Sequence, residues 1–396
     1  MTRNFHGSTF FIVFVFVIYS CKSDNDYLHV FENKVEFNLD RKVKFPLDSL
    51  TSSSKRSIKY LMSDEGKEFL YSLNQNINAI EIFDIEFQKW VRRIRLPVQG
   101  PNGVGALSYI LPINKDSLIT LSSAQQLSII TSQGKVLDRF GPFFNRETGE
   151  GAYVLALGEV SPIYRQGKVY FFTTAGYDTY IDESTSNNLS NEKNLMILDL
   201  KSRKVEYRMK FPETYLNSNG LWGDHYYAVK YHDFNPTTGD FVLSLPADQN
   251  VYVTDYNEQY KPVYAGSEHF DQIAPFYKWK NLSRLSSEDE AKDFALNPSY
   301  QNIKYDRFRD VFYRVVELPY TEEELETSSD AFIGIKRWSL VTLDSNFTKI
   351  GEKKMPENLL AGSFLIIKEG LLIYDYIENK NDEDNLNYSL FEVKIK

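Results

Sequence analysis

Residues 79–97 read AIEIFDIEFQKWVRRIRLP, and this stretch decides the fold. An apolar run ends on the polar turn residue Asp84, and a second run with several basic residues ends on Pro97. Short apolar runs bounded by turn residues are typical of β-strands. A terminal proline suits an outer strand, because proline has no N–H to donate to a neighbouring strand. We therefore interpret the stretch as the last two strands of a small antiparallel sheet.

The same pattern recurs four more times along the chain. The copies are LSIITSQGKVLDRFGP (127–142), LMILDLKSRKVEYRMKFP (195–212), VYVTDYNEQYKPVYAG (251–266) and LVTLDSNFTKIGEKKMP (340–356). The turn residue and the terminal Pro or Gly are 10 to 13 positions apart (84 to 97, 132 to 142, 199 to 212, 255 to 266, 344 to 356). In the third copy Val205, Tyr207, Met209 and Phe211 alternate with charged residues, which predicts a strand with one solvated face. Such recurrence indicates a repeat architecture.

Two earlier strands are predicted before each of the first four copies. They are 57–61 with 68–73, 106–111 with 116–121, 154–157 and 162–164 with 168–173, and 226–230 with 240–245. A sixth unit at the C-terminus has three strands (360–367, 370–376 and 388–395), and Arg41–Pro46 carries the signature of the missing outer strand. Radially repeated four-stranded units form a β-propeller. We predict an all-β, six-bladed β-propeller closed by this N-terminal outer strand, because an open ring would leave bare edges. A seventh blade would need a hidden unit in the long fifth repeat.

Three segments of the first unit resemble a known bacterial repeat. Ser63–Tyr71, Asn78–Asp84 and Pro101–Gly105 are similar to the YVTN-type propeller repeat, and later units match more loosely. The resemblance implies a six-bladed, TolB-like propeller in an uncharacterised Bacteroidota lipoprotein family. It covers most of residues 40–396 and bears on the fold, not on chemistry.

The N-terminus has the layout of a secretory signal peptide. A positive start with Arg3 precedes the uncharged run 10–19, and Cys21, the only cysteine, follows directly. Residues 18–21 (Ile-Tyr-Ser-Cys) resemble a bacterial lipobox, which predicts lipid attachment at Cys21. We expect a signal peptide (1–20), a lipidated N-terminus and linker (21–38) and one propeller domain (39–396). The alternatives are an ordinary cleaved signal followed by a chance cysteine, or an uncleaved anchor.

Residues 22–26 (Lys-Ser-Asp-Asn-Asp) resemble the tether with which Bacteroidota lipoproteins are exported to the cell surface, although a plain polar linker has the same composition. We expect an outer-membrane lipoprotein, on the cell surface or the periplasmic face. Without residues 1–20 the chain has 44 basic and 54 acidic residues, a balance of −10. This charge argues against binding to nucleic acid or anionic lipid headgroups.

The longest connections between predicted strands are 141–153, 212–225 and 266–300. In a propeller such connections gather on one face, where binding residues tend to lie on a rigid scaffold. The third contains a predicted short helix over 286–296, with Ser287 as its N-cap. It is either a cover over one mouth of the channel or an insertion packed on a blade.

Residues 219–227 form the most site-like stretch. Trp222 offers a stacking face, and the neighbouring Asp224 and His225 are able to share a proton. Arg146, in the first long connection, is the other candidate ligand-binding residue. The alternative is a plain turn in which Trp222 covers the core.

No metal site, cofactor fingerprint or catalytic motif stands out in the sequence. The leading hypothesis is a lipid-anchored, non-catalytic propeller that binds a peptide, glycan or partner protein at its loop-bearing face. A hydrolase or lyase using acids at the channel mouth and His225 is the second hypothesis, and an envelope scaffold is the third.

Overall fold

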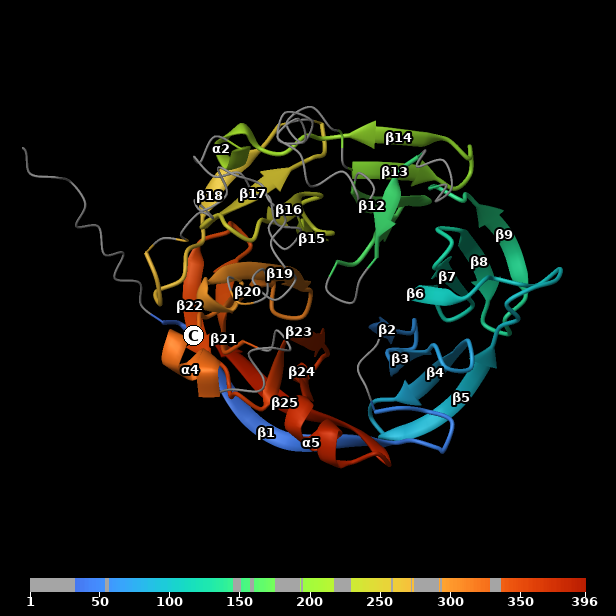
Figure 1. Ribbon diagram of the computed structural model, residues 1–396, viewed down its shortest axis with the longest axis horizontal. Helices are drawn as coiled ribbons and strands as arrows, with labels where there is room; N and C mark the ends of the chain where they lie inside the picture. The colour runs from blue at the N-terminus through green and yellow to red at the C-terminus, as the bar shows by residue number, and fades with distance from the viewer. Residues whose placement is uncertain are drawn as a thin grey trace, which may run out of the picture. The chain divides into compact units, whose positions relative to one another are not determined.

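The computed structural model describes residues 33–53, 57–144, 151–156, 160–174, 193, 195–216, 229–257, 259–271, 273, 292, 294–327 and 336–396. The strands within these ranges form six antiparallel sheets, arranged as blades around a common axis (Figure 1). They belong to one compact unit, Glu32–Lys396. The prediction of an all-β, six-bladed propeller is therefore confirmed.

The blades follow one another along the chain, each from its inner strand to its outer strand. Blade 1 comprises β2 (Ile58–Met62), β3 (Glu68–Asn74), β4 (Ala79–Asp84) and β5 (Lys89–Arg95). Blade 2 comprises β6 (Leu107–Asn114), β7 (Ser117–Ser122), β8 (Leu127–Thr131) and β9 (Val136–Phe140). Blade 3 comprises β10 (Tyr153–Leu155) and β11 (Ile163–Arg165), which both pair with β12 (Lys168–Thr174), then β13 (Leu195–Asp199) and β14 (Val205–Arg208).

The second half of the ring repeats this order. Blade 4 comprises β15 (Tyr231–Phe234), β16 (Phe241–Ser244), β17 (Asn250–Thr254) and β18 (Lys261–Tyr264). Blade 5 comprises β19 (Ser299–Asp306), β20 (Val311–Glu317), β21 (Trp338–Asp344) and β22 (Lys349–Lys354). Blade 6 comprises β23 (Leu359–Ile366), β24 (Gly370–Asp375), β25 (Asn385–Ile395) and, as its outer strand, β1 (Val35–Pro46).

The two ends of the described chain close the ring, as predicted. β1 pairs antiparallel with β25, from Val35 opposite Ile395 to Pro46 opposite Asn385. The strand is longer than the segment 41–46 that carried its sequence signature. Its approach also touches blade 5, because the Lys34 N–H donates to the Ile350 carbonyl at 2.8 Å. The segment that leads into β1 therefore contacts blade 5, and β1 itself forms the outer strand of blade 6.

One end of the ring holds the connections that concern function. The strands of a blade alternate in direction. The start of the inner strand, the turn between the two middle strands and the end of the outer strand therefore all lie on the same side of the ring. We call this end the loop face. The described helices α2 (Glu213–Leu216), α4 (Glu322–Thr327) and α5 (Tyr376–Asn381) all lie in its connections. The hydrophobic core lies between neighbouring blades, as in the cluster of Phe45, Phe83 and Leu372 between blades 6 and 1.

The predicted inner strand at 226–230 is wrong. The inner strand of blade 4 is β15, Tyr231–Phe234, and residues 229 and 230 precede it without strand structure. β15 contains the polar residues His232 and Asp233. His232 is buried and Asp233 is half-buried, and both are hydrogen-bonded to neighbouring blades, so hydrophobicity could not reveal this strand.

The predicted alternation of the third outer strand holds only in part. β14 ends at Arg208, and Met209 has a left-handed φ of 62°. This backbone turn carries Met209 and Phe211 into the core, while Val205 and Tyr207 stay at the rim, 39% and 40% exposed. The four apolar residues therefore do not share one buried face.

Of the predicted helix over 286–296, the structure describes residues 292 and 294–296, which are helical. Phe294 and Ala295 are buried, so this end packs onto the protein. Ser287 lies outside the described residues.

Candidate functional site

The residues that the sequence singled out as candidates are Cys21, Arg146, Trp222, Asp224 and His225, and all five lie outside the described residues. The structure describes the scaffold that flanks them. Phe144 and Gly151 form an antiparallel bridge, so the segment that contains Arg146 leaves and re-enters at one point. On either side of the segment that contains Trp222, α2 lies in a loop-face connection and β15 begins at the loop face.

Blade 1 fixes the loop that enters it through a buried carboxylate. Glu81 on β4 is fully buried, with the apolar residues Ile80 and Ile82 on either side of it in the strand. It accepts hydrogen bonds from Arg93 Nε of β5 at 2.6 Å, from Trp90 Nε1 at 3.0 Å and from Asn74 Nδ2 at 3.1 Å. Thr51, in the connection from β1 to β2, donates to the same carboxylate at 3.4 Å. We call such an arrangement a latch: a buried carboxylate bound to an outer-strand cation and to a polar side chain of the incoming connection.

Blade 5 has a second latch, built on Glu352 of β22. This fully buried carboxylate accepts from Lys349 Nζ at 2.7 Å, and Ser339 of β21 also donates to it. Ser267, in the connection from blade 4, donates its hydroxyl at 2.7 Å. Burial alone would raise the pKa of Glu352, but the charge and hydrogen bond of Lys349 and the two serine hydroxyls outweigh it, and the net pKa lies below its ordinary value.

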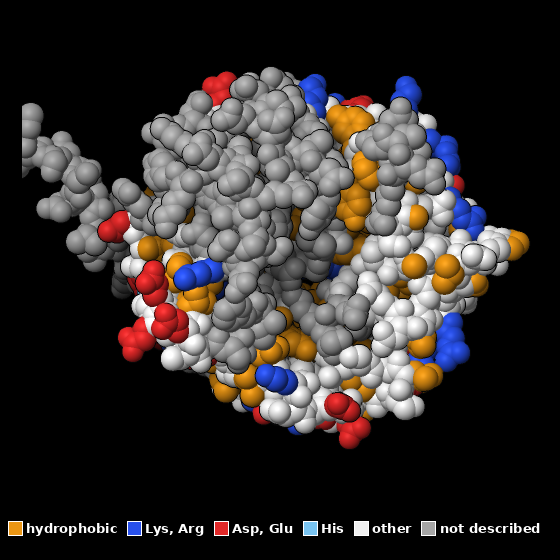
Figure 2. Space-filling model, viewed as in Figure 1, with side chains coloured by type: hydrophobic (Ala, Val, Ile, Leu, Met, Phe, Trp, Pro, Cys, Tyr) orange, Lys and Arg blue, Asp and Glu red, His pale blue; other side chains and the backbone are white. Residues whose placement is uncertain are grey.

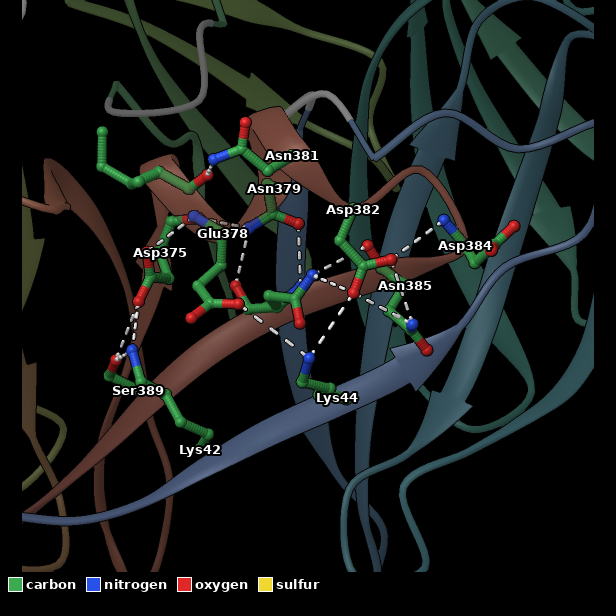
Figure 3. Close-up of polar contacts among 12 residues, drawn as sticks. Lys42, Lys44, Asp375, Glu378, Asn379, Asn381, Asp382, Asp384, Asn385 and Ser389 are labelled. Atoms are coloured by element: carbon green, nitrogen blue, oxygen red, sulfur yellow. Dashed lines mark hydrogen bonds and ion pairs between the residues drawn. The ribbon is translucent and has the colours of Figure 1, made fainter.

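Blade 6 has a third latch, on Asp375 at the end of β24, and Figure 3 shows this carboxylate with Lys42 and Ser389. Lys42 of the closing strand β1 forms an ion pair with this buried carboxylate, and Asn358 of the incoming connection donates to it at 2.7 Å. Asp375 is also the N-cap of α5, since it accepts from the Glu378 N–H at 3.1 Å. Next to it, Lys44 reaches Asp382 at 3.5 Å. The ring closure and α5 are thus held by the same group.

In blade 2 the outer strand binds the incoming connection directly, without a buried carboxylate between them. Arg139 of its outer strand donates directly to the Gly103 carbonyl at 3.0 Å and to the Pro101 carbonyl, both in the incoming connection. Arg93, Arg139, Lys349 and Lys42 therefore have equivalent tasks in four blades. The basic residues of the repeated sequence pattern are, at these positions, structural.

One buried arginine joins blade 5 to blade 4. Arg314 on β20 is fully buried and donates to the carbonyls of Asp248, Gln249, Asn250 and Ala265 at 2.6 to 3.2 Å. Its guanidinium also lies 3.6 Å from the centre of the Tyr300 ring. Burial lowers the pKa of Arg314 to about 10, which leaves it charged at neutral pH.

Polar side chains also link the inner strands near the axis. Lys59 of β2 lies over the Tyr109 ring of blade 2 and donates to the Ser161 hydroxyl of blade 3 at 2.8 Å. From the other side, His232 Nε2 contacts the Ser161 carbonyl at 2.9 Å. Burial lowers the pKa of His232 to about 4, so its ring is neutral at physiological pH.

The next residue on β15 faces the opposite neighbour. Asp233 accepts from the Tyr305 N–H of blade 5 at 2.7 Å, and burial raises its pKa to about 6. Lys304 in turn donates to the Phe364 carbonyl of blade 6 at 2.7 Å. A pocket large enough for a single water lies beside Lys304, lined also by Ser363, Phe364 and Tyr388.

The chemistry of these groups is that of a framework. Glu81, Glu352 and Asp375 each accept from three or more donors, so their acceptor positions are engaged. Among the described residues no three His, Cys, Asp or Glu side chains are grouped so as to hold a metal ion.

None of the helices within the described ranges combines the length and apolarity that a membrane crossing demands.

Sequence reasoning missed the latches, although one signal was present. A charged residue in the middle of an apolar strand, such as Glu81 in AIEIFD, costs free energy unless it is paired. The partners could not be read from the sequence, since Thr51 and Arg93 lie 30 positions before and 12 positions after Glu81.

Comparison with one solved structure supports the fold, and two further structures are similar at a lower level. The crystal structure of a DUF4221 family member from Bacteroides vulgatus superimposes with a TM-score of 0.75 at 23% identity, covering 92% of this chain and 100% of that chain. The extracellular domain of a one-component system from B. thetaiotaomicron gives a TM-score of 0.42 at 10% identity, covering 85% of this chain and 33% of that chain. The extracellular domain of a hybrid two-component system from the same organism gives 0.41 at 8%, covering 91% and 42%.

Among curated proteins, none matches the chain. The sequence profile of DUF4221, described as a domain of unknown function, matches residues 30–354, which is most of the propeller. The chain therefore belongs to the DUF4221 family.

Proposed function

We propose that this protein is a non-catalytic binding protein that takes a peptide, glycan or partner protein at its loop face. The observation that carries the proposal is the set of latches on Glu81, Glu352 and Asp375. They fix the connections that enter blades 1, 5 and 6 with buried, charge-assisted hydrogen bonds. Pre-organised loops on a rigid scaffold lose little entropy on binding, which favours recognition.

The longer connections supply candidate contacts. The segment of Trp222, Asp224 and His225 and the segment of Arg146 both connect strands whose ends lie at the loop face. An indole face, a carboxylate, an imidazole and a guanidinium suit a ligand with both apolar and polar groups, such as a peptide or a sugar.

The roles of the buried carboxylates and of His232 support the proposal that the protein is non-catalytic. The carboxylates of the three latches are engaged in structural hydrogen bonds, and His232 is neutral and held between Ser161 and Tyr256. A general acid or base needs a free position within hydrogen-bond reach of a substrate. These groups therefore serve the ring rather than a reaction.

We further propose that Cys21 is lipidated and anchors the protein at the outer membrane, on the cell surface or the periplasmic face. The lipobox-like residues 18–21 support this assignment. Growth with a labelled fatty acid should label the wild type and leave Cys21→Ser unlabelled. Protease treatment of intact cells should then separate the surface from the periplasmic location.

The binding proposal is tested with the chain from residue 22 onward on peptide and glycan arrays. Trp222→Ala should weaken binding of the best ligand about tenfold or more and leave the melting temperature unchanged. Tyr164→Ala, an aromatic truncation of an exposed residue on β11 at the opposite end of blade 3, is the matched control and should bind normally. A large drop in melting temperature for Trp222→Ala would make Trp222 a core residue. Turnover of the ligand would favour the hydrolase or lyase, and a stable complex with an envelope protein without small ligands would favour the scaffold.

A further inference from the structure

The outer strand of blade 1 carries cations that the latch does not use. Residues 89–95 read KWVRRIR, with four basic residues and no acidic one. Arg93 belongs to the latch on Glu81. Lys89, Arg92 and Arg95 have no ion-pair partner within the described residues, although the protein as a whole is acidic, and Lys89 Nζ lies 4.7 Å from the centre of the Phe87 ring. Several cations on one strand of an acidic protein, none of them in an ion pair with a residue that the structure describes, call for an explanation beyond stability.

Large apolar side chains are exposed at the same place. Phe87 is 61% exposed, Trp90 46% and Val91 40%. We call the set Phe87, Lys89, Trp90, Val91, Arg92 and Arg95 the β5 rim surface. Figure 2 shows basic and hydrophobic side chains next to one another along the right-hand rim, on the side where Figure 1 places β5. Tryptophan and arginine are the residues most enriched where partner proteins bind tightly.

The exposed aromatic residues are held in place. The Trp90 indole N–H donates to buried Glu81 at 3.0 Å, which fixes its ring. The Phe87 backbone N–H donates to Asp84 at 3.0 Å. The adjoining Gln88 side chain accepts from the Lys44 N–H of β1 at 3.3 Å. A surface whose apolar anchors are fixed before binding loses little entropy when a partner arrives.

We propose that the β5 rim surface docks an extended, acidic segment of a partner protein. Charge complementarity selects the partner: carboxylates placed along β5 would meet Lys89, Arg92 and Arg95, and apolar residues between them would cover Trp90 and Val91. An outer strand also presents backbone N–H and C=O groups to which an extended segment can add. The same cations repel a second copy of β5, so the surface discriminates against self-association. This inference does not rest on the proposed ligand at the loop face.

The test uses the full chain in detergent and two fluorescein-labelled peptides. One alternates glutamate with valine, and the other has lysine in place of glutamate. By anisotropy the acidic peptide should bind, the basic one should not, and raising salt from about 50 to about 300 mM should weaken binding several-fold. The double variant Lys89→Glu/Arg92→Glu should weaken binding about tenfold or more. Lys89 is exposed and Arg92 is half-buried, and an unchanged melting temperature of the double variant would show that the fold is retained.

The matched control is Lys353→Glu/Lys354→Glu on β22, the outer strand of blade 5. These two lysines are exposed, but β22 presents no large exposed apolar side chain. The control should change peptide binding less than about twofold. Equal binding of the basic peptide, or an equal loss in both double variants, would overturn the proposal. Binding to anionic vesicles without peptide binding would assign the surface to a membrane, and a dimer broken by Lys89→Glu/Arg92→Glu would assign it to a second copy. Either result would overturn the acidic partner, and neither would bear on Trp222.

Discussion

Blade 5 and blade 4 are neighbours, but different interactions stabilise each of them. Blade 5 has strands of six to eight residues and fixes its incoming connection with the carboxylate of Glu352. Blade 4 has strands of four or five residues, and its core is aromatic, with Phe241 stacked on Tyr256 at 3.9 Å between ring centres. Directional, charge-assisted bonds define one geometry, whereas ring contacts tolerate several. Blade 4 is therefore positioned mainly by groups that its neighbours supply.

The strongest of these groups is Arg314 of blade 5. We expect Arg314→Met to lower the free energy of unfolding by about 3–5 kcal/mol, because four carbonyls of blade 4 would lose their donor in a buried site. Denaturant unfolding measures the change. Arg203→Met removes an arginine that pairs with Asp138 on the exposed rim, and should cost less than about 1 kcal/mol. If Arg314→Met and Arg203→Met lowered the free energy of unfolding equally, the bonds from Arg314 to blade 4 would not be important for stability.

The second prediction concerns the two titratable residues of β15. The folded pKa of Asp233 is raised to about 6, so the stability it contributes at low pH is lost as pH rises from about 4 to 6. The folded pKa of His232 is lowered to about 4, so stability falls as pH drops from 6.5 to 4. The two effects oppose each other between pH 4 and 6.

Replacing either Asp233 or His232 should leave the pH dependence of stability that the other residue causes. Relative to wild type, Asp233→Asn should gain about 2–3 kcal/mol of unfolding free energy between pH 4 and pH 6. His232→Gln should change in the opposite direction over the same range. Urea titrations at several pH values measure both slopes. Parallel curves for the three proteins would mean that neither group titrates with a shifted pKa in the folded state.

The third prediction tests the latch of blade 5. Glu352→Gln retains the side-chain shape but removes the charge that pairs with Lys349, and should cost about 1–2 kcal/mol at neutral pH. The folded pKa of Glu352 is lowered, so this difference should be present above pH 4.5 and shrink as pH falls below it. Glu324→Gln, which breaks the more exposed pair with Arg337, is the control and should cost less than about 1 kcal/mol. A pH-independent cost would contradict an ionised latch.

The contrast between the blades also explains what the sequence could predict. Turn residues and alternating apolar runs reveal strands whose side chains meet neighbouring blades, and the closing pair of β1 and β25 follows from counting them. The sequence did not reveal β15, because His232 and Asp233 are polar and depend on hydrogen-bond partners in other blades. The latches escaped for the same reason, since Ser267 and Glu352 come together only in the folded ring. The candidate residues Trp222 and His225 lie outside the described residues and remain predictions.

The smallest expected effect belongs to β14, where the alternation predicted from the sequence breaks. Val205 and Tyr207 lie at the rim, so Val205→Thr and Tyr207→Thr should each change the free energy of unfolding by less than about 0.5 kcal/mol. Met209, the residue with the left-handed φ, is fully buried, so Met209→Ala should lower the free energy of unfolding by about 2–4 kcal/mol. If the strand continued to Phe211 with one buried face, as the sequence suggested, Val205 and Tyr207 would be as sensitive as Met209. Thermal unfolding of the three variants therefore decides whether β14 ends at Arg208.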